Sequence, residues 1–154
     1  MNLCIYTVGA ISGLSYDNCV KEFNIRVKKL EDMGYDVLYP MLAKDYLRNE
    51  LNLRAEGYPD NPISTNHAIV RTDFWRVDKA DILFVDFTNA VDRVSIGSVA
   101  EMSRGYAQNK LIVTVMQKDN IHRHAFVTEM SSIIFETLDE AFKYFVFYKT
   151  LIQK

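Results

Sequence analysis

The segment Ile82-Leu83-Phe84-Val85-Asp86-Phe87 is apolar at every position except Asp86, and polar residues flank it on both sides. A short continuous apolar run of this kind is typical of a strand that is buried on both faces of a sheet. Three similar runs predict further strands, and a shorter run is a weaker candidate for a fifth strand. These runs cover residues 3–8, 36–39 and 111–116 and, for the weaker candidate, 132–135.

Helical patterns separate the apolar runs. Between Ser15 and Met33 the apolar residues recur at spacings of three and four, and Gly34 provides a stop signal. Similar patterns predict helices over about residues 66–79, 98–109 and 138–151. Strands that alternate with helices predict an α/β fold in which helices cover both faces of a parallel sheet. The sequence shows no repeat and no linker, so we expect a single domain over residues 1–154.

Residues 41–65 lack such a pattern and contain several Asn, Asp, Gly and Pro residues, so we expect a long loop there. Long loops in compact domains are often lids or binding loops. Ligands of an open parallel sheet bind outside the carboxyl ends of its strands. A ligand site is therefore expected among the segments that follow the strands, which start at Gly9, Pro40, Phe87 and Met116.

The composition argues against several classes of protein. The chain has 154 residues, of which 49% are hydrophobic and 25% charged, as in an ordinary globular domain. A net charge of −2 argues against binding to a nucleic-acid polymer, and no apolar run approaches the roughly 18 residues of a membrane helix. The first residues lack the pattern of a signal peptide, and Cys4 and Cys19 have neither metal nor redox spacing. We therefore expect a cytoplasmic protein with reduced thiols and no membrane partner.

The first candidate for ligand binding is the loop Gly9-Ala10-Ile11-Ser12-Gly13, between the first strand and the first helix. Two glycines and a serine at a helix entrance can present backbone N–H groups to an anion. The loop is not the Gly-x-Gly-x-x-Gly fingerprint of dinucleotide binding. It is equally compatible with a tight turn from strand to helix in which Ser15 is the N-cap.

Asp73 on the second predicted helix lies on the same apolar stripe as Val77 and Ala80. A carboxylate that faces the core or a cleft is costly unless it is paired or used in chemistry. The alternatives are therefore a functional residue, a structural ion pair with Arg71 or Arg76, or a helix rotated by one position.

Glu101 has two interpretations. Ser98 and Glu101 match the capping box Ser-x-x-Glu, which explains both residues as a helix start without any chemistry. Glu101 is also expected in the first helical turn after the carboxyl end of a strand, where a ligand site should lie. There a carboxylate can attack an electron-poor carbon and form a covalent intermediate, and the helix N-terminus would favour its ionised form.

The segment His122-Arg123-His124 offers a pair of imidazoles, but no third metal ligand follows at a useful spacing. We expect a solvated loop or a subunit contact there. Tyr6, Phe87 and Trp75 could stack on a base, although aromatic residues at strand ends and on helices usually belong to the core.

Taken in order, these segments resemble the nucleoside 2-deoxyribosyltransferase family and its relatives, the deoxynucleoside 5'-monophosphate N-glycosidases. Residues 5–13 are similar to the opening strand of the family, with its tyrosine, and to its Gly-containing loop. Asp73 is followed eight residues later by Asp81 and an apolar strand, as in the family. Residues 97–101, Gly-Ser-Val-Ala-Glu, continue through a small-residue helix to Lys110. The resemblance extends over most of the chain and fades toward the C-terminus.

The resemblance implies a flavodoxin-like or Rossmann-like sheet of about five parallel strands and an activity on deoxynucleosides or deoxynucleotides. Glu101 would attack C1' of the deoxyribose and release the base, and a second base or water would then take the sugar. Asp73 would contact the base and protonate the departing nitrogen, while the hydroxyl of Tyr6 would hold Glu101. No metal or organic cofactor is implied. A homodimer or higher homo-oligomer is implied, in which a neighbouring subunit completes the active site.

The chain departs from the family at two places. Transferases that act on free nucleosides usually have an aspartate two residues before the glycine of the glutamate motif, whereas this chain has Ser95, as the monophosphate-hydrolysing relatives do. Ser95 therefore points to a 5'-monophosphate, although Asp92 in a shifted loop could restore a carboxylate. Near the C-terminus, His124 or Thr128 could replace the segment that a neighbouring subunit contributes in the family. The substrate-binding residues predicted in this way are Gly9, Ile11, Ser12, Gly13, Ser95, Gly97 and Ser98.

The sequence thus predicts an enzyme that cleaves an N-glycosidic bond, with transfer of deoxyribose to another base as the leading hypothesis. The alternative is hydrolysis of a 2'-deoxynucleoside 5'-monophosphate. A further alternative is a nucleotide-binding module without catalysis, in which Glu101 is only a helix cap.

Overall fold

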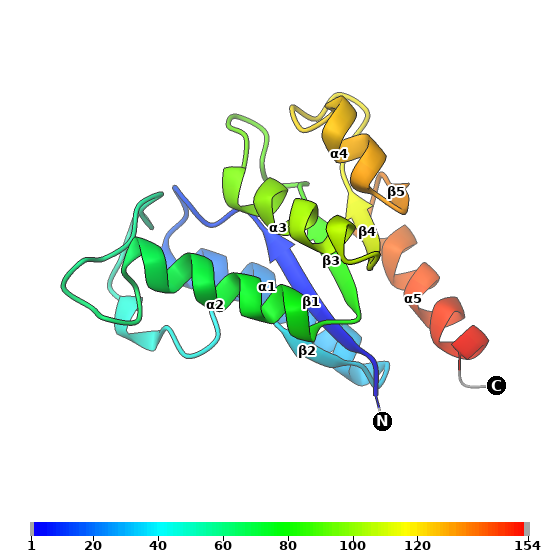
Figure 1. Ribbon diagram of the computed structural model, residues 1–154, viewed down its shortest axis with the longest axis horizontal. Helices are drawn as coiled ribbons and strands as arrows, with labels where there is room; N and C mark the ends of the chain where they lie inside the picture. Colours follow the sequence, from blue (N-terminus) through cyan, green and yellow to red (C-terminus); the bar gives the residue numbers. More distant parts are fainter. Residues whose placement is uncertain (1, 153–154) are drawn as a thin grey trace.

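The computed structural model describes residues 2–152, which form a parallel sheet with helices on both faces (Figure 1). The sheet has five strands in the order β2-β1-β3-β4-β5, and each neighbouring pair is parallel. The predicted α/β fold with about five strands is confirmed, and the weaker strand candidate is present. The strands are β1 (Cys4–Gly9), β2 (Asp36–Leu38), β3 (Ile82–Asp86), β4 (Leu111–Val115) and β5 (Ile133–Phe135).

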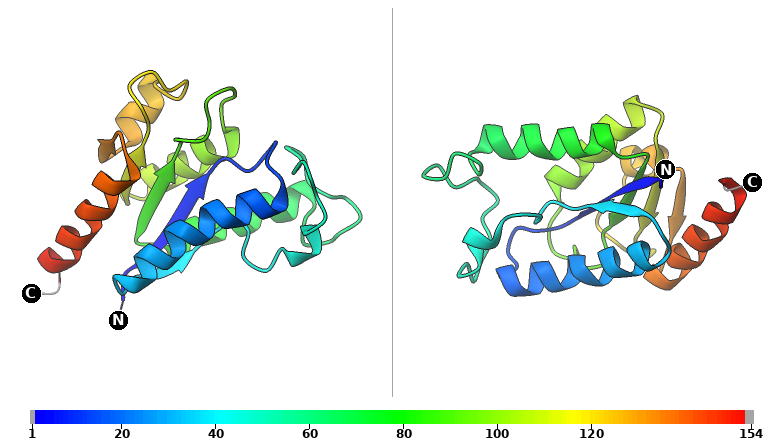
Figure 2. Two further views of the ribbon diagram at one scale, coloured as in Figure 1. Left: turned by 180° about the vertical axis from the view of Figure 1, so that it is seen from behind. Right: turned by 90° about the horizontal axis from the view of Figure 1, so that it is seen from below.

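The helices form the two outer layers. Figure 2 shows α1 and α5 on one side of the sheet, and α2 and α3 on the other. The layers follow from the alternation of side chains along the strands: Tyr6 and Leu83 pack toward α2 and α3, whereas Ile5 and Phe84 pack toward α1 and α5. None of the helices within residues 2–152 has the length and apolar character that crossing a membrane requires. The helical elements are α1 (Tyr16–Asp32), the 3-10 turn η1 (Asp45–Leu47), α2 (Asn66–Lys79), α3 (Ile96–Ala107), α4 (Ala125–Met130) and α5 (Leu138–Ile152).

The helix starts test the capping predictions. The Ser15 hydroxyl accepts a hydrogen bond from the backbone N–H of Asn18, so Ser15 caps α1 as predicted. Helix α3 begins at Ile96, earlier than predicted, and its N-cap Ser95 makes no capping hydrogen bond with its side chain. The predicted capping box is therefore wrong. Ser98 lies inside the helix, and Glu101 lies in its second turn rather than its first.

Residues 41–65 form the predicted long loop, interrupted only by η1 and by turns within the described part of the chain. The loop is anchored to the body of the protein, because Leu47 and Leu53 are buried in one cluster with Cys19 of α1. The backbone N–H of Gly13 also donates to the carbonyl of Leu53 at 2.9 Å. The loop thus packs beside the segment that joins β1 to α1.

Candidate functional site

A pocket of about 490 Å³ opens at the carboxyl ends of the strands, near the point where the strand order reverses between β1 and β3. This volume is typical of small-molecule sites. Gly13 lies outside the lining of the pocket, and its φ of +88° serves the turn before α1 instead. The lining includes these residues singled out from the sequence: Gly9, Ile11, Ser12, Asp73, Ser95, Gly97, Ser98 and Glu101.

Asp73 and Glu101 line the pocket, and Tyr6 and Arg76 lie behind them outside the lining; we call these four residues the floor of the pocket. The floor includes a contact between β1 and α3. The fully buried Tyr6 donates its hydroxyl proton to Oε1 of Glu101 over 2.7 Å. Gly105, one turn beyond Glu101, explains how α3 comes so close, since a Cβ at this position would overlap the side chain of Leu83 on β3. The glycine lets α3 pack tightly on the sheet, and this packing brings Glu101 to Tyr6.

Asp73 reaches the same pocket from α2. Its Oδ1 lies 2.7 Å from Nη1 of Arg76, and 15% of its side chain is exposed. The same nitrogen of Arg76 lies 3.4 Å from the carbonyl oxygen of Pro40, near the start of the segment that follows β2. The structural ion pair considered from the sequence therefore exists, with Arg76 as the partner. It leaves the carboxylate of Asp73 at the pocket surface, so the structural and functional interpretations are compatible.

The two carboxyl groups of the floor have perturbed acidities. Burial and, after it, the charge of Asp73 raise the pKa of Glu101 to about 8, against the hydrogen bond from Tyr6 and the charges of Arg76 and Lys44. Burial also raises the pKa of Asp73, against the charges of Lys44 and Arg76. Near neutral pH the two groups therefore share a proton and titrate as a coupled pair. Glu101 lies in the second turn of α3, and burial is the largest influence on its pKa.

Lys44 lines the pocket although the sequence did not single it out. It follows Ala43, whose φ of 62° lies in the left-handed region and turns the chain at this point. Burial lowers the pKa of Lys44, while the charges of Asp73 and Glu101 favour its charged form. Its place after the carboxyl end of β2 was the signal that could have identified it.

The segment between β3 and α3 contributes a further cation. Arg93 lines the pocket, as does Arg54 from the long loop, whereas Asp92 is exposed and lies outside the lining. The suggestion that Asp92 restores a carboxylate is therefore wrong. The guanidinium of Arg93 lies over the β1–α1 loop, about 3.6 Å from where a Cβ of Gly13 would be.

The wall of the pocket, which we define as residues 93–98, includes the serine pair of Ser95 and Ser98. Their hydroxyl oxygens lie 2.8 Å apart. The backbone N–H of Ser95 donates to Nε2 of His122 at 2.8 Å, and only 1% of His122 is exposed. The expectation of a solvated loop is therefore wrong for His122. His122 is identified only by its contact with Ser95 on a different loop, and no sequence pattern indicates that contact.

Two other predicted residues lie apart from the pocket in this chain. His124 caps α4 by accepting from the backbone N–H of Phe126, and Thr128 is exposed on the same helix. Their suggested role in a neighbouring subunit stays a prediction. Within residues 2–152 no group of three or more His, Cys, Asp or Glu side chains is arranged to bind a metal ion. Phe87 is buried as expected, but Trp75 is 54% exposed, so the expectation of a core position is wrong for Trp75.

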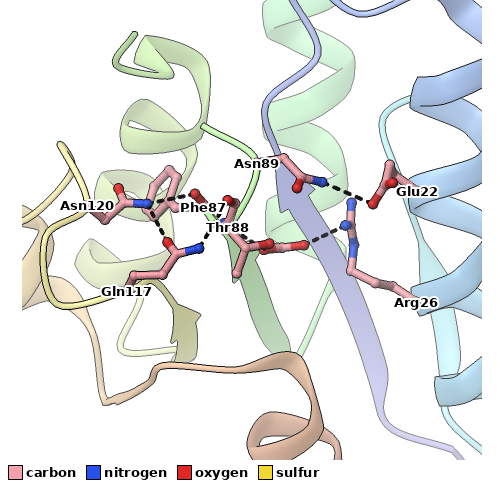
Figure 3. Close-up of polar contacts among 8 residues, drawn as sticks. Glu22, Arg26, Phe87, Thr88, Asn89, Gln117 and Asn120 are labelled. Carbon is pink, nitrogen blue, oxygen red and sulfur yellow. Dashed lines mark hydrogen bonds and ion pairs between the residues drawn. The ribbon is translucent and has the colours of Figure 1, made fainter. Parts of the chain in front are cut away.

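Polar contacts connect residues 86–89, at the end of β3 and the start of the β3–α3 segment, to α1 and to the segment after β4. Figure 3 shows Arg26 and Glu22 on the α1 side, and Gln117 and Asn120 on the other side near Phe87. Asn120 donates through Nδ2 to the carbonyl of Phe87 at 2.8 Å. The first residues of the β3–α3 segment are thus fixed from both sides of the sheet end.

Comparison by sequence finds no matching family model and no matching curated protein. Solved structures do share the fold. A conserved protein from Enterococcus faecalis V583 superposes with a TM-score of 0.64 at 12% identity. The CMP N-glycosidase BcmB from Clostridium botulinum superposes with a TM-score of 0.58 at 14% identity. In both cases the similarity covers 94% of this chain and 98% of the neighbour, and at these identities it establishes a common fold.

Proposed function

We propose that the protein cleaves the N-glycosidic bond of a 2'-deoxynucleoside or its 5'-monophosphate, with Glu101 as the nucleophile. The proposal rests on the floor of the pocket, where a buried carboxylate is held by the hydroxyl of Tyr6 and a second carboxylate, Asp73, lies beside it. Carboxyl pairs with perturbed acidities are the usual catalytic groups for glycosidic bonds. A neighbour of the same fold that is named a CMP N-glycosidase supports the same type of reaction.

The reaction proceeds in two steps. A carboxylate oxygen of Glu101 bonds to C1' while the C1'–N bond breaks, and the electron pair of that bond stays on the base nitrogen. Asp73 gives the departing base its proton. The acceptor then bonds to C1' and frees the carboxylate of Glu101, while the proton that the acceptor loses passes to Asp73. The proton shared by the carboxyl pair must therefore be on Asp73 when the bond breaks. The hydrogen bond from Tyr6 favours the ionised form of Glu101 that this arrangement requires.

Hydrolysis of a 5'-monophosphate is the form of the reaction that the pocket supports best. Arg54 and Arg93 add positive charge to its lining, and Ser95 and Ser98 add hydroxyl groups. Guanidinium groups and hydroxyls are suitable partners for a phosphate. Transfer of deoxyribose to a second base is the other candidate, since it passes through the same covalent intermediate and differs only in the acceptor.

Product analysis tests the function. The protein is incubated with deoxycytidine, its 5'-monophosphate and CMP, each with and without free adenine, and bases and nucleosides are separated by chromatography. Free cytosine from the monophosphate without adenine supports hydrolysis, whereas a new adenine nucleoside that forms only with adenine supports transfer. A sugar adduct on Glu101 after rapid acid quenching supports the covalent step. Nucleotide binding without release of base from any substrate contradicts the proposal and favours a binding module.

A further inference from the structure

His122 is a buried side chain in a polar segment. It is 1% exposed, and its ring stacks on Phe87 with the ring centroids 3.9 Å apart and the planes at 12°. A buried imidazole needs hydrogen-bond partners for both of its nitrogens. The partners therefore define what the residue does.

Both ring nitrogens have partners, and the partners determine the tautomer. Nε2 faces the backbone N–H of Ser95 at 2.8 Å, and a backbone N–H can only donate, so Nε2 carries no proton. Nδ1 consequently carries the proton and donates to Oδ1 of Asn120 at 2.9 Å. The pKa of His122 is lowered by burial, in agreement with a neutral ring.

Asn120 is itself held in one orientation. Its Nδ2 donates to the carbonyl of Phe87 at 2.8 Å and to Oε1 of Gln117 at 2.9 Å (Figure 3). Its Oδ1 therefore faces His122, whose backbone N–H also donates to it at 3.0 Å. Asn120 and the stacking on Phe87 thus hold the imidazole in an orientation that directs Nε2 toward Ser95.

The far end of this chain of contacts is the wall of the pocket. Ser95 is the N-cap of α3, and its N–H lies among the helix-start donors that the helix itself cannot satisfy. The Ser95 and Ser98 hydroxyls pair at 2.8 Å, and both residues line the pocket. Fixing the Ser95 backbone therefore fixes the direction of a hydroxyl pair in the pocket lining.

We propose that His122 is a positioning residue for substrate binding: together with Asn120 it holds the backbone of Ser95, so that the serine pair is in place before the substrate arrives. The nature of the substrate rests on the proposed function, whereas the contact of His122 with Ser95 does not. His122 acts on binding rather than on the chemical step, because Glu101 is held independently by Tyr6 from β1.

Matched substitutions separate this role from a purely structural one. His122→Phe keeps a ring against Phe87 but removes the acceptor, and His122→Gln keeps an acceptor. His67→Phe, at an exposed histidine outside the pocket lining, is the control. We expect His122→Phe to raise KM for deoxycytidine 5'-monophosphate about tenfold, as for the loss of one buried hydrogen bond, with kcat within about twofold. His122→Gln should recover most of the loss, and His67→Phe should match the wild type.

A fall in kcat with unchanged KM, or equal KM values for His122→Phe and the wild type, would overturn the proposal. If His122→Phe does not fold, the tautomer of His122 and the protection of the Ser95 amide in the wild type still decide the proposal, because they need no variant.

Nuclear magnetic resonance tests the contact without any turnover. In the ¹⁵N-labelled protein we expect His122 to carry its proton on Nδ1, and the amide proton of Ser95 to be protected from exchange in the wild type but not in His122→Phe. A proton on Nε2, or an unprotected Ser95 amide in the wild type, contradicts the proposal. If the protein releases no base from any substrate, the proposed function fails. The resonance experiment and calorimetric binding of CMP then still judge the role of His122.

Discussion

Two buried carboxylates lie on opposite faces of the sheet near its carboxyl edge, and their partners differ. Asp86, at the end of β3, lies 2.6 Å from the guanidinium of Arg26 on α1, with 2% and 4% of the two side chains exposed. Glu101, on α3, has a phenol as its hydrogen-bond partner and another carboxyl group close by. The guanidinium of Arg26 balances the negative charge of Asp86, whereas the phenol of Tyr6 supplies no positive charge to Glu101. The difference separates a carboxylate that maintains the fold from one that is available for chemistry.

The surroundings of Asp86 complete its structural role. Its second oxygen accepts from the backbone N–H and the hydroxyl of Thr88, at 2.9 and 2.6 Å. Arg26 in turn lies over the ring of Phe23, 4.5 Å from its centroid. The one unpartnered buried side-chain nitrogen or oxygen among residues 2–152 is Nε of Arg26. Both oxygens of Asp86 are thus occupied within the protein, whereas Glu101 opens onto a pocket.

The largest effect is expected from Glu101→Gln. The amide cannot attack C1', so base release should fall by about a thousandfold or more. The glutamine still accepts from Tyr6, and it removes the cost of burying a charge, so the free energy of unfolding should be equal or higher. Chromatographic assay of released base and urea denaturation check the two outcomes. Normal base release by Glu101→Gln or Glu101→Ala would show that Glu101 is not the nucleophile.

The matching change at Asp86 should have the opposite profile. Asp86→Asn keeps the acceptor for Thr88 but leaves the buried charge of Arg26 without a partner, which should cost about 3 kcal/mol of stability. Urea denaturation measures the loss. The double variant Arg26→Met with Asp86→Asn removes the orphaned charge and should recover part of it. A loss below about 0.5 kcal/mol would show that the ion pair does not maintain the fold.

Asp73 tests whether one carboxylate can both maintain the fold and take part in the chemistry. Asp73→Asn should slow base release about a hundredfold by removing the proton donor. Folding should stay largely intact, because the amide oxygen can still accept from Arg76, which also keeps its contact with Pro40 and its interaction with the charge of Glu101. Asp78→Asn, on the same helix and paired at the surface with Arg104, is the control. Substrates with a better leaving base should be affected less, because they need less protonation. Unfolding of Asp73→Asn would instead assign the residue to the structural ion pair alone.

The floor of the pocket could be predicted from the sequence because its residues lie on regular elements. The period of a helix places Asp73 on the apolar stripe of α2, and Glu101 was expected near a strand end, whereas the contact of Tyr6 with Glu101 was implied by the family resemblance. The local motif at Glu101 was misleading, because Ser-x-x-Glu has the same letters whether the helix starts at the serine or, as here, before it.

The remaining parts of the site depend on contacts that have no sequence period. Lys44 enters the pocket through a left-handed turn at Ala43, in a loop whose path is set by buried apolar residues. The histidine behind the wall meets a backbone N–H that lies 27 residues away along the chain. Neither position could be derived from spacing, since each is determined by where a loop packs after the sheet has formed.

The pH dependence of stability tests directly why the two carboxylates differ. The pKa of Glu101 is raised in the native state to about 8, from an ordinary value of 4.5. A raised pKa means that the native state binds the proton more tightly than the unfolded chain does. Protonation of Glu101 therefore contributes stability below about pH 4.5, and this contribution is lost as the pH rises through about 8.

Glu101→Gln lacks this contribution, so the wild type should lose stability relative to the variant as the pH rises from about 5 to about 8.5. The slope should stay below about 1.4 kcal/mol for each pH unit, because a single proton is involved and Asp73 shares it. Urea denaturation of both proteins at matched pH values measures the difference. A difference that is flat across this range, or that grows in favour of the wild type, would mean that native Glu101 is ionised at neutral pH. Glu101 would then be an ionised buried carboxylate that is stabilised by its surroundings, like Asp86.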